Sequence, residues 1–332
     1  MILRTVLRRT LRVIALVVAF IVVLSGLLAG AYRVQFTGAP ASWAKSTGND
    51  ALWLGHGWVD GRKNEQDVEA LATRLKATGI KDLYVHTGPF AKNGAVQDRY
   101  PMAPHFVRWM HRYAPGVRVQ AWLGQKVDGY LDLEDQQVRA RIVRSITEVV
   151  LDLGFDGVHY NFEPIGSGDE NFLDLLAKTR AVLPPTAKLS TSTPQIEPYS
   201  AMRPIARALV SHDKYWSPEY FRRVAAQVDQ VAIMTYDSFM PTGSLYGGHV
   251  ARQAELALDL VPEDRLVLIG APAYHDHGVF FLDAAESVAA AAEGARLAVT
   301  ENGARKNFGL ALYVDFAATD QDWNEYERYW MR

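Results

Sequence analysis

The chain contains no cysteine, and this absence removes several classes of protein at once. Without thiols there is no disulfide, no thiolate zinc site and no lipid anchor on an N-terminal cysteine. An excess of basic charge is also missing, because 35 lysines and arginines face 37 acidic residues. Four of those arginines lie within residues 1–12, so the rest of the chain is mildly acidic and nucleic acid is not expected as a partner.

One long hydrophobic run is present, directly after those arginines. Residues 13–31 ("VIALVVAFIVVLSGLLAGA") carry no charge, and as a helix they nearly span the ~30 Å hydrocarbon layer of a membrane. Basic residues before the run would keep that end in the cytoplasm and place the body outside. We therefore expect residues 1–31 to be a transmembrane signal anchor in the cell membrane. A cleaved signal peptide is the alternative, since residues 29–31 (Ala-Gly-Ala) fit the cleavage pattern and would leave a secreted protein.

The remainder reads as a linker followed by one large domain. Residues 32–50 are rich in small and polar residues and are expected to be the linker. From residue 51 to 332, short apolar runs alternate with longer amphipathic ones. This alternation predicts a parallel sheet, and eight repeats in this length favour a closed (β/α)8 TIM barrel. A doubly wound open sheet is the alternative, but no G-x-G-x-x-G follows the first expected strand. The expected strands are 52–58, 80–87, 117–124, 154–164, 188–195, 230–238, 265–274 and 308–316.

The longest irregular segments are 88–103, 194–216 and 238–248, and each follows an expected strand. They would therefore lie on the carboxyl-terminal rim, where barrels of this kind place their active sites.

The fourth expected strand ("GFDGVHYNFEP", residues 154–164) alternates polar and apolar side chains. A strand has a period of two, so His159, Asn161 and Glu163 would share the face that points into the barrel, with Glu163 nearest the rim. Asn161 and Glu163 could then flank one substrate atom. The alternative is a buried polar cluster satisfied by its neighbours, although packing alone gives little reason for such side chains at the rim.

At this strand the chain resembles the family 18 glycoside hydrolases, the chitinases and their relatives. Their signature reads D-G-x-D-x-D-x-E, and the final Glu is the proton donor. Asp156, Gly157 and Glu163 match it, whereas His159 and Asn161 replace the two middle aspartates. The family's sixth-strand motif, M-x-Y-D, also occurs here, as Met-Thr-Tyr-Asp.

The sequence departs from the family pattern at two further places. The third expected strand contains "AWLGQ" (residues 121–125) without the family's S-x-G-G, and Tyr313 stands where the family has a tryptophan beneath the sugar. The related family 85 endo-β-N-acetylglucosaminidases look like D-G-x-x-x-N-x-E at the fourth strand. The chain fits every defined position of that pattern, so Asn161 is compatible with an active enzyme.

The resemblance implies a retaining glycosidase in which the 2-acetamido oxygen of the substrate is the nucleophile and an oxazoline forms. Glu163 would be the general acid and later the base, and Asn161 would orient the acetamido group. Tyr236 would donate to the acetamido oxygen, and Asp237 would hold a sugar hydroxyl. No cofactor or metal is implied.

Other residues are expected to contact substrate because they lie on or at the ends of the same strands. Aromatic faces at strand ends could stack on sugar rings, or they could equally be ordinary rim packing. The further expected substrate contacts are His159, Met234, Trp58, Trp122, Tyr274, Tyr313 and His86, and Asp156 is expected to give structural support.

The two replaced aspartates alter the expected electrostatics. The family pattern D-x-D-x-E could carry three negative charges. The corresponding positions here carry at most one negative charge, because they are His159, Asn161 and Glu163. Less repulsion would lower the pKa of Glu163, and a protonated His159 would lower it further. We therefore expect an activity optimum more acidic than that of relatives with three carboxylates.

A pair of histidines, His275 and His277, lies after the seventh expected strand. Their i, i+2 spacing could bind a metal, but no third ligand is evident and no metal is expected.

The predicted function is an extracytoplasmic glycosidase that cleaves a β-linked glycan containing N-acetylhexosamine. Chitin, peptidoglycan, an N-glycan core and an exopolysaccharide all contain such a sugar. One alternative is a non-catalytic, lectin-like relative, although such proteins typically lose the glutamate that is present here as Glu163. The other is a hydrolase of a different polysaccharide without acetamido participation, which the altered third and eighth strands leave open.

Overall fold

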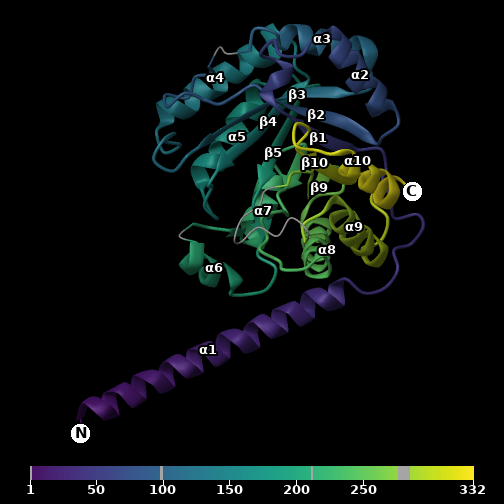
Figure 1. Cartoon of the computed structure of the whole chain (residues 1–332). Coiled ribbons are helices and arrows are strands. Elements are labelled where there is room, and N and C mark those ends of the chain that lie inside the picture. Colours follow the sequence, from purple (N-terminus) through teal and green to yellow (C-terminus); the bar gives the residue numbers. More distant parts are fainter. Residues whose placement is uncertain (1, 98–99, 211, 276–284) are drawn as a thin grey trace.

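The structure is a computed structural model that describes residues 2–97, 100–210, 212–275 and 285–332. Eight parallel strands form a closed barrel in the order β1-β10-β9-β8-β5-β4-β3-β2 (Figure 1). The predicted (β/α)8 barrel is therefore confirmed, and the open sheet is wrong. The strands are β1 (Asp50–Leu54), β2 (Ile80–His86), β3 (Arg118–Lys126), β4 (Gly157–Glu163), β5 (Lys188–Thr193), β8 (Gln230–Ile233), β9 (Leu266–Pro272) and β10 (Phe308–Tyr313).

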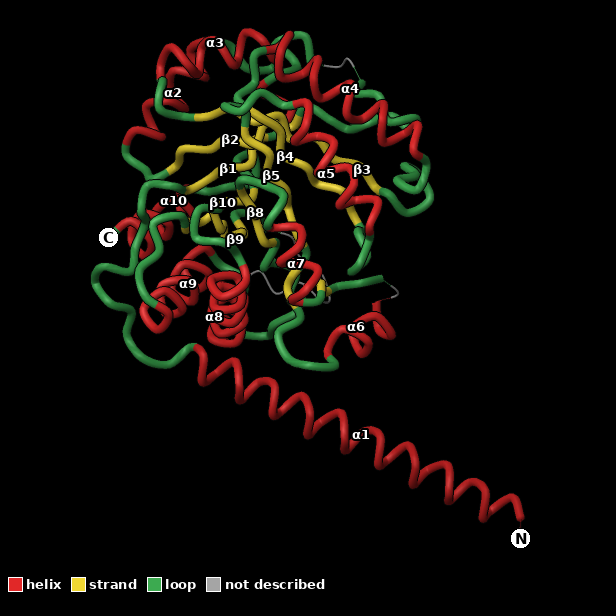
Figure 2. Tube along the Cα trace, turned by 180° about the vertical axis from the view of Figure 1, so that it is seen from behind, coloured by secondary structure: helices red, strands yellow, loops and turns green. Residues whose placement is uncertain are grey.

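Helices cover the outside of the barrel, as Figure 2 shows. Their apolar faces pack on the outward side chains of the strands. Gly154 ends the helix before β4 with a φ of 79°, a left-handed conformation that glycine adopts without strain. The helices are α2 (Glu65–Lys76), α3 (Ala103–Tyr113), α4 (Gln136–Leu153), α5 (Glu170–Val182), α7 (Pro218–Ala225), α8 (Gly243–Leu260), α9 (Val288–Asn302) and α10 (Asp320–Glu325), with short turns at η1 (His56–Trp58) and η2 (Tyr326–Met331).

The irregular segment after β5 contains structure of its own. β6 (Gln195–Ile196) pairs in parallel with β7 (Tyr215–Trp216), and α6 (Met202–Val210) connects them. The side chain of Gln253 on α8 bonds both backbone groups of Ile196, at 2.7 and 2.8 Å. The indole of Trp216 donates to the carbonyl of Ile165 just beyond β4, at 2.8 Å. The insertion is thereby fixed beside the end of β4.

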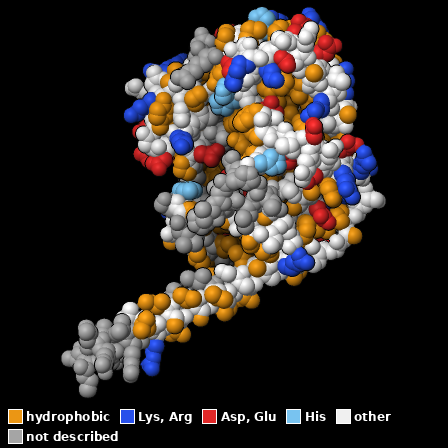
Figure 3. All heavy atoms as spheres, viewed as in Figure 1, with side chains coloured by type: hydrophobic (Ala, Val, Ile, Leu, Met, Phe, Trp, Pro, Cys, Tyr) orange, Lys and Arg blue, Asp and Glu red, His pale blue; other side chains and the backbone are white. Residues whose placement is uncertain are grey.

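The N-terminal helix α1 (Ile2–Gln35) extends away from the barrel in Figures 1 and 2. Figure 3 shows apolar side chains along much of its described surface. Over the residues that the structure describes, however, no helix combines the length and apolar character needed to cross a membrane. The transmembrane helix predicted from residues 13–31 is therefore not supported.

The last turn of α1 belongs to the folded body. Tyr32 is fully buried against α8. A Cβ on Gly247 would collide with the ring of Phe36, and one on Gly248 with the carbonyl of Tyr32, so both glycines allow this close approach. Residues 32–50, predicted to be a linker, begin as the end of α1, and Ala44 and Asp50 within them are buried.

Polar side chains fill the base of the barrel lumen. The fully buried carboxylate of Asp82 accepts hydrogen bonds from Arg118 and from the amide of Gln120, the latter at 2.8 Å. The same amide donates to Gln230 at 2.8 Å, and the hydroxyl of Ser190 donates to the Gln120 carbonyl oxygen at 2.8 Å. Each buried group thus has a partner, as burial in a low dielectric requires.

A second buried carboxylate, Asp50, joins the two ends of the domain at the start of β1. It accepts hydrogen bonds from the hydroxyl of Tyr326 (2.6 Å), the indole of Trp330 (2.9 Å), the backbone N–H of Leu310 (2.8 Å) and the hydroxyl of Ser46 (2.5 Å). Burial raises the pKa of Asp50, and these four donors act in the opposite direction. The C-terminal turn η2 is held to the barrel through this carboxylate.

We expect Asp50→Ala to lower the free energy of unfolding by about 3 kcal/mol or more, because it leaves several buried donors without an acceptor. Urea unfolding followed by circular dichroism measures this loss. Asp264→Ala is the control, since Asp264 is exposed and forms a surface ion pair with Arg265, so it should change stability by less than about 1 kcal/mol. Equal unfolding midpoints for the two variants would contradict the anchoring role of Asp50.

Candidate active site

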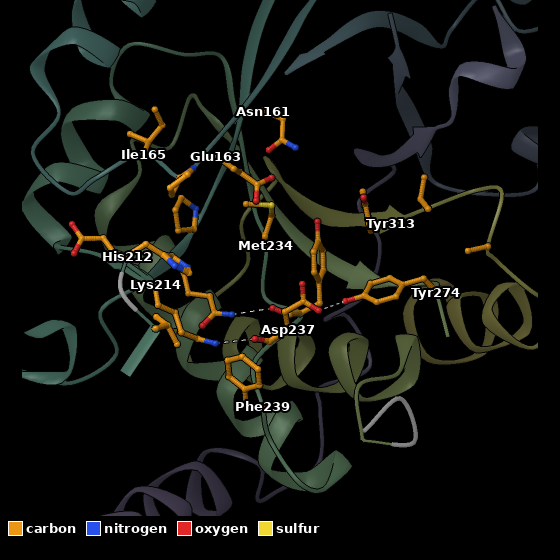
Figure 4. Close-up of a pocket in the computed structure, with 18 of the residues that line it drawn as sticks. Asn161, Glu163, Ile165, His212, Lys214, Met234, Asp237, Phe239, Tyr274 and Tyr313 are labelled. Carbon is orange, nitrogen blue, oxygen red and sulfur yellow. Dashed lines mark hydrogen bonds between the residues drawn. The ribbon is translucent and has the colours of Figure 1, made fainter. Parts of the chain in front are cut away.

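A pocket of about 640 Å³ opens where the carboxyl ends of the barrel strands meet (Figure 4). Its walls come from β4, from the insertion after β5 and from the segments that follow β8, β9 and β10. The position agrees with the rim site predicted from the sequence. Seven of the predicted site residues line it: Asn161, Glu163, Met234, Tyr236, Asp237, Tyr274 and Tyr313.

The alternation along β4 places its polar side chains inside the barrel. Tyr160 and Phe162 point outward and contact α5, where the Tyr160 hydroxyl bonds Thr179 at 2.8 Å. His159 lies inside the barrel, and Asn161 and Glu163 reach the pocket. The period-two prediction for this strand is therefore confirmed.

His159 lies deeper than predicted and does not reach the pocket. It is fully buried, with Nδ1 2.8 Å from the hydroxyl of Ser190 and Nε2 2.9 Å from that of Ser192. The indole N–H of Trp53 donates to Nε2 at 3.2 Å, and the ring of Tyr84 stacks on the imidazole at 3.7 Å. His159 therefore belongs to the polar network of the lumen and is not the substrate contact that was expected.

The same surroundings keep His159 neutral. Burial holds its pKa well below the usual value. Because the indole of Trp53 can only donate, Nε2 accepts and the proton belongs on Nδ1, facing Ser190. The expectation that a protonated His159 lowers the pKa of Glu163 is therefore wrong.

Glu163 is the exposed end of β4, where its side chain lines the pocket, and the surrounding protein removes much of the bulk water from its carboxyl. This burial raises the pKa of Glu163, and the negative charge of Asp237 raises it further. The side chain of Asn161 and the charges of His212 and Lys126 lower this pKa without reversing the shift. The net direction favours the protonated form, which a general acid requires before reaction.

Asn161 lines the pocket and has a buried acceptor, its Oδ1. The Asn161 side chain lowers the pKa of Glu163, while its buried Oδ1 has no hydrogen-bond partner among the described residues. An unpaired buried acceptor costs about 1–3 kcal/mol, so native proteins seldom keep one without a reason. A ligand N–H placed here would satisfy it.

Three tyrosines and one aspartate form the opposite wall. Tyr236 and Tyr313 stack at 5.1 Å, and Tyr274 meets both edge-on. The hydroxyl of Tyr274 donates to the carboxylate of Asp237 at 2.5 Å. Asp237 has a left-handed φ of 53°, and its backbone N–H donates to Glu286 at 2.7 Å, which holds this conformation. Burial also raises the pKa of Tyr236, so its hydroxyl stays a donor.

Three further predicted substrate contacts, besides His159, lie outside the pocket. The indole of Trp58 donates to Asp315 at 2.6 Å. Trp122 is buried between His86, at 4.7 Å, and Tyr313, at 6.1 Å between ring centroids. Burial lowers the pKa of His86 to about 4, so it is neutral near pH 7. Trp122 and His86 therefore support the aromatic wall from behind instead of lining the pocket.

Asp156 lies just before β4 and has the structural contacts predicted for it. Its carboxylate accepts from the backbone N–H of Val119 at 2.7 Å and lies 2.8 Å from Nε2 of His111.

The histidine pair after β9 was considered as a metal site. Nε2 of His275 lies 2.9 Å from Asp322, while His277 is outside the described residues. Within the described ranges, no group of three or more possible ligands could hold a metal ion.

Several pocket residues carried no recognisable signal in the sequence. Glu286, which is not part of the lining but holds Asp237, lies 49 residues beyond it, and no motif pointed to it. The insertion after β5 has no period, so nothing indicated which of its residues turn inward. The structure adds Gln195, His212, Asp213, Lys214, Phe239 and Phe316 to the lining.

We compared the chain with known proteins to find what it is similar to. No curated protein matches the chain. Among solved structures, the Bacillus cereus spore cortex-lytic enzyme SleL is 14% identical, with 85% of this chain and 74% of that chain covered and a TM-score of 0.60. A class V chitinase from Pseudomonas fluorescens is 16% identical (84% and 98% covered, TM-score 0.55), and a chitinase from Bacteroides thetaiotaomicron is 11% identical (83% and 92%, TM-score 0.57). At these identities the likeness shows a shared fold.

The sequence model of one family covers most of the chain. Residues 62–322 match the family described as Glycosyl hydrolases family 18. This range contains β2 to β10 and every residue that lines the pocket. The chain therefore belongs to the glycosyl hydrolases of family 18, and it is a glycosidase.

Proposed function

We propose that the chain hydrolyses a β-linked glycan at an N-acetylhexosamine by a retaining, substrate-assisted mechanism. The observation that carries this proposal is the unpaired Oδ1 of Asn161, which lies two positions before the protonatable Glu163 in the same pocket. An acetamido N–H is a donor of the kind that this acceptor lacks.

The first step breaks the glycosidic bond. The acetamido group lies with its N–H toward Asn161 Oδ1 and its oxygen toward the hydroxyl of Tyr236. The oxygen attacks the anomeric carbon, while protonated Glu163 gives its proton to the departing glycosidic oxygen. An oxazolinium forms, and its positive charge is stabilised by the amide of Asn161 and by the carboxylate that Glu163 has become.

The second step restores the sugar. Glu163 takes a proton from water, whose oxygen attacks the anomeric carbon from the face that the leaving group left. The oxazoline ring opens, the acetamido group reforms, and Glu163 is protonated again for the next cycle. Two inversions at one carbon give retention of configuration. Asp237, fixed by Tyr274 and Glu286, is placed to accept from a sugar hydroxyl.

We also propose that the barrel acts outside the cytoplasm. The arginines of residues 1–12 followed by the uncharged residues 13–31 are typical of an export signal. In cells that express the full chain, added protease should digest the barrel when the layers outside the cytoplasmic membrane are permeabilised and that membrane stays intact. Digestion that requires lysis of the cytoplasm would contradict the proposal.

We expect Glu163→Gln to lower kcat by about 10²–10⁴-fold, the range that a general acid contributes. Glutamine keeps the shape of the side chain but cannot deliver the proton, so binding of an N-acetylglucosamine oligomer should persist. Release of reducing ends measures turnover, and calorimetry measures binding. Glu219→Gln, on the exposed surface of α7, serves as the matched control with unchanged kcat. Retained turnover in Glu163→Gln would remove Glu163 from the proposed role.

Inhibition by a thiazoline mimic of the oxazoline tests whether the acetamido group takes part in the reaction. The mimic should inhibit the wild type competitively. It should inhibit Asn161→Ala much less, because alanine cannot accept a hydrogen bond from the protonated ring nitrogen of the mimic. A polysaccharide hydrolase without acetamido participation would be insensitive in both forms.

The raised pKa of Glu163 gives a pH prediction. Activity should fall as pH rises through this pKa, because the proton needed by the leaving group is lost. Asn161→Asp places a second carboxylate beside Glu163, which favours its protonated form and should move this falling limb to higher pH. The pH dependence of kcat/KM for the two forms measures the shift, and a limb that stays or moves to lower pH would contradict it.

A further inference from the structure

The insertion after β5 places a cation in the pocket. The ammonium of Lys214 donates to the backbone carbonyl of Asp237 at 2.8 Å and lies 3.9 Å from the ring centroid of Phe239. Figure 4 shows Lys214 and His212 on one side of the pocket and Tyr274 on the other, with the end of Glu163 between them. A substrate that fills the pocket therefore comes close to this ammonium.

The carboxylates of the pocket wall are already compensated. Asp213 accepts from the backbone N–H of Ser167 at 2.9 Å and lies 3.5 Å from the guanidinium of Arg207. Asp237 accepts from the hydroxyl of Tyr274. Glu163 is held toward its neutral form by the raised pKa described above.

Lys214 lacks such a partner. In the described part of the chain its ammonium forms no ion pair, and one of its three donors is used, by the Asp237 carbonyl. The nearby acid, Glu286, accepts from the backbone N–H groups of Asp237 and Ser238 and from the Ser238 hydroxyl. Burial lowers the pKa of Lys214 to about 8, and the negative charges of Glu286 and Asp237 raise it only in part, so the charged form loses more hydration than its present contacts replace.

We propose that Lys214 binds a carboxylate on the glycan, on a sugar next to the N-acetylhexosamine at Glu163. The preferred substrate is then an anionic polymer in which N-acetylhexosamine neighbours a carboxylate-bearing sugar. A carboxylate would fill the donors that remain on the ammonium with charge-assisted hydrogen bonds, whereas a neutral glycan would leave the charge unpaired. The inference rests on the proposed function and specifies the substrate class for that same site.

Lys214 has a competing structural role that the test must separate. Asp237 and Phe239 both have left-handed backbones, with φ of 53° and 62°. Through the Asp237 carbonyl and the Phe239 ring, Lys214 could simply hold this turn. A holding role affects every substrate equally, whereas recognition of a carboxylate affects only substrates that carry one.

The experiment uses three soluble oligomers of equal length. One alternates N-acetylglucosamine with N-acetylmuramic acid, the second is the same oligomer with its carboxyl groups converted to amides, and the third contains N-acetylglucosamine alone. At low salt the wild type should have a kcat/KM about ten- to a hundredfold higher for the carboxylate form than for the amide form, the range of one charge-assisted hydrogen bond. High salt should reduce this preference.

Two variants of Lys214 test whether this residue causes the preference for the carboxylate form. Lys214→Met keeps the length of the apolar stem without the charge, so it should lose about ten- to a hundredfold on the carboxylate form and roughly threefold or less on the amide form. Lys214→Arg should keep a preference for the carboxylate. Equal losses of Lys214→Met on both forms would overturn the proposal in favour of the holding role. If Lys214→Met does not fold, the wild-type comparison in low and high salt decides.

Failure of the inference can be told from failure of the proposed function. Wild type that cleaves the N-acetylglucosamine oligomer but treats carboxylate and amide forms alike overturns only the role of Lys214. Binding to Glu163→Gln gives a readout without chemistry and should show the same order of affinities. If the wild type cleaves none of the three oligomers and Glu163→Gln binds none, the proposed function falls and the inference with it.

Discussion

Closure of the parallel sheet between β1 and β10 is the constraint on which the rest of the structure depends. Pairing of Ala51 with Ala311 removes both sheet edges and brings all strand ends to one rim. It also seals a lumen in which any polar group must find a partner. Asp50 completes the closure, because its carboxylate joins the first strand of the barrel to the C-terminal turn.

The sealed lumen explains how the chain accommodates a fourth strand with two aspartates fewer than the family signature. A hydrogen-bonded path runs from Asp82 through Gln120 and Ser190 to His159. All of these groups are buried, and His159 is neutral, so the strand brings a single ionisable carboxyl to the pocket, that of Glu163. Protonation of the acid therefore depends on burial and on Asp237 more than on charges along its own strand.

The fold could be predicted from the sequence because its signals are local. Apolar runs with periods of two and 3.6 residues marked all eight barrel strands and the helices between them. The alternation of β4 likewise fixed the inward face of Asn161 and Glu163. The N-terminal segment was harder to predict, since its apolar composition indicated a membrane span. The packing of Phe36 on Gly247 and of Tyr32 on Gly248 depends on a helix more than two hundred residues away.

By itself, the sequence determined the barrel, the family resemblance, and the strand that carries the acid and the amide, because spacing along one chain decides these. Only the tertiary structure decided that His159, Trp58, Trp122 and His86 stay out of the pocket and that Lys214 enters it. Burial depth depends on what neighbouring strands and loops contribute, and those neighbours lie far away in sequence. The same holds for the protonation of Glu163, whose surroundings come from several strands and from the insertion after β5.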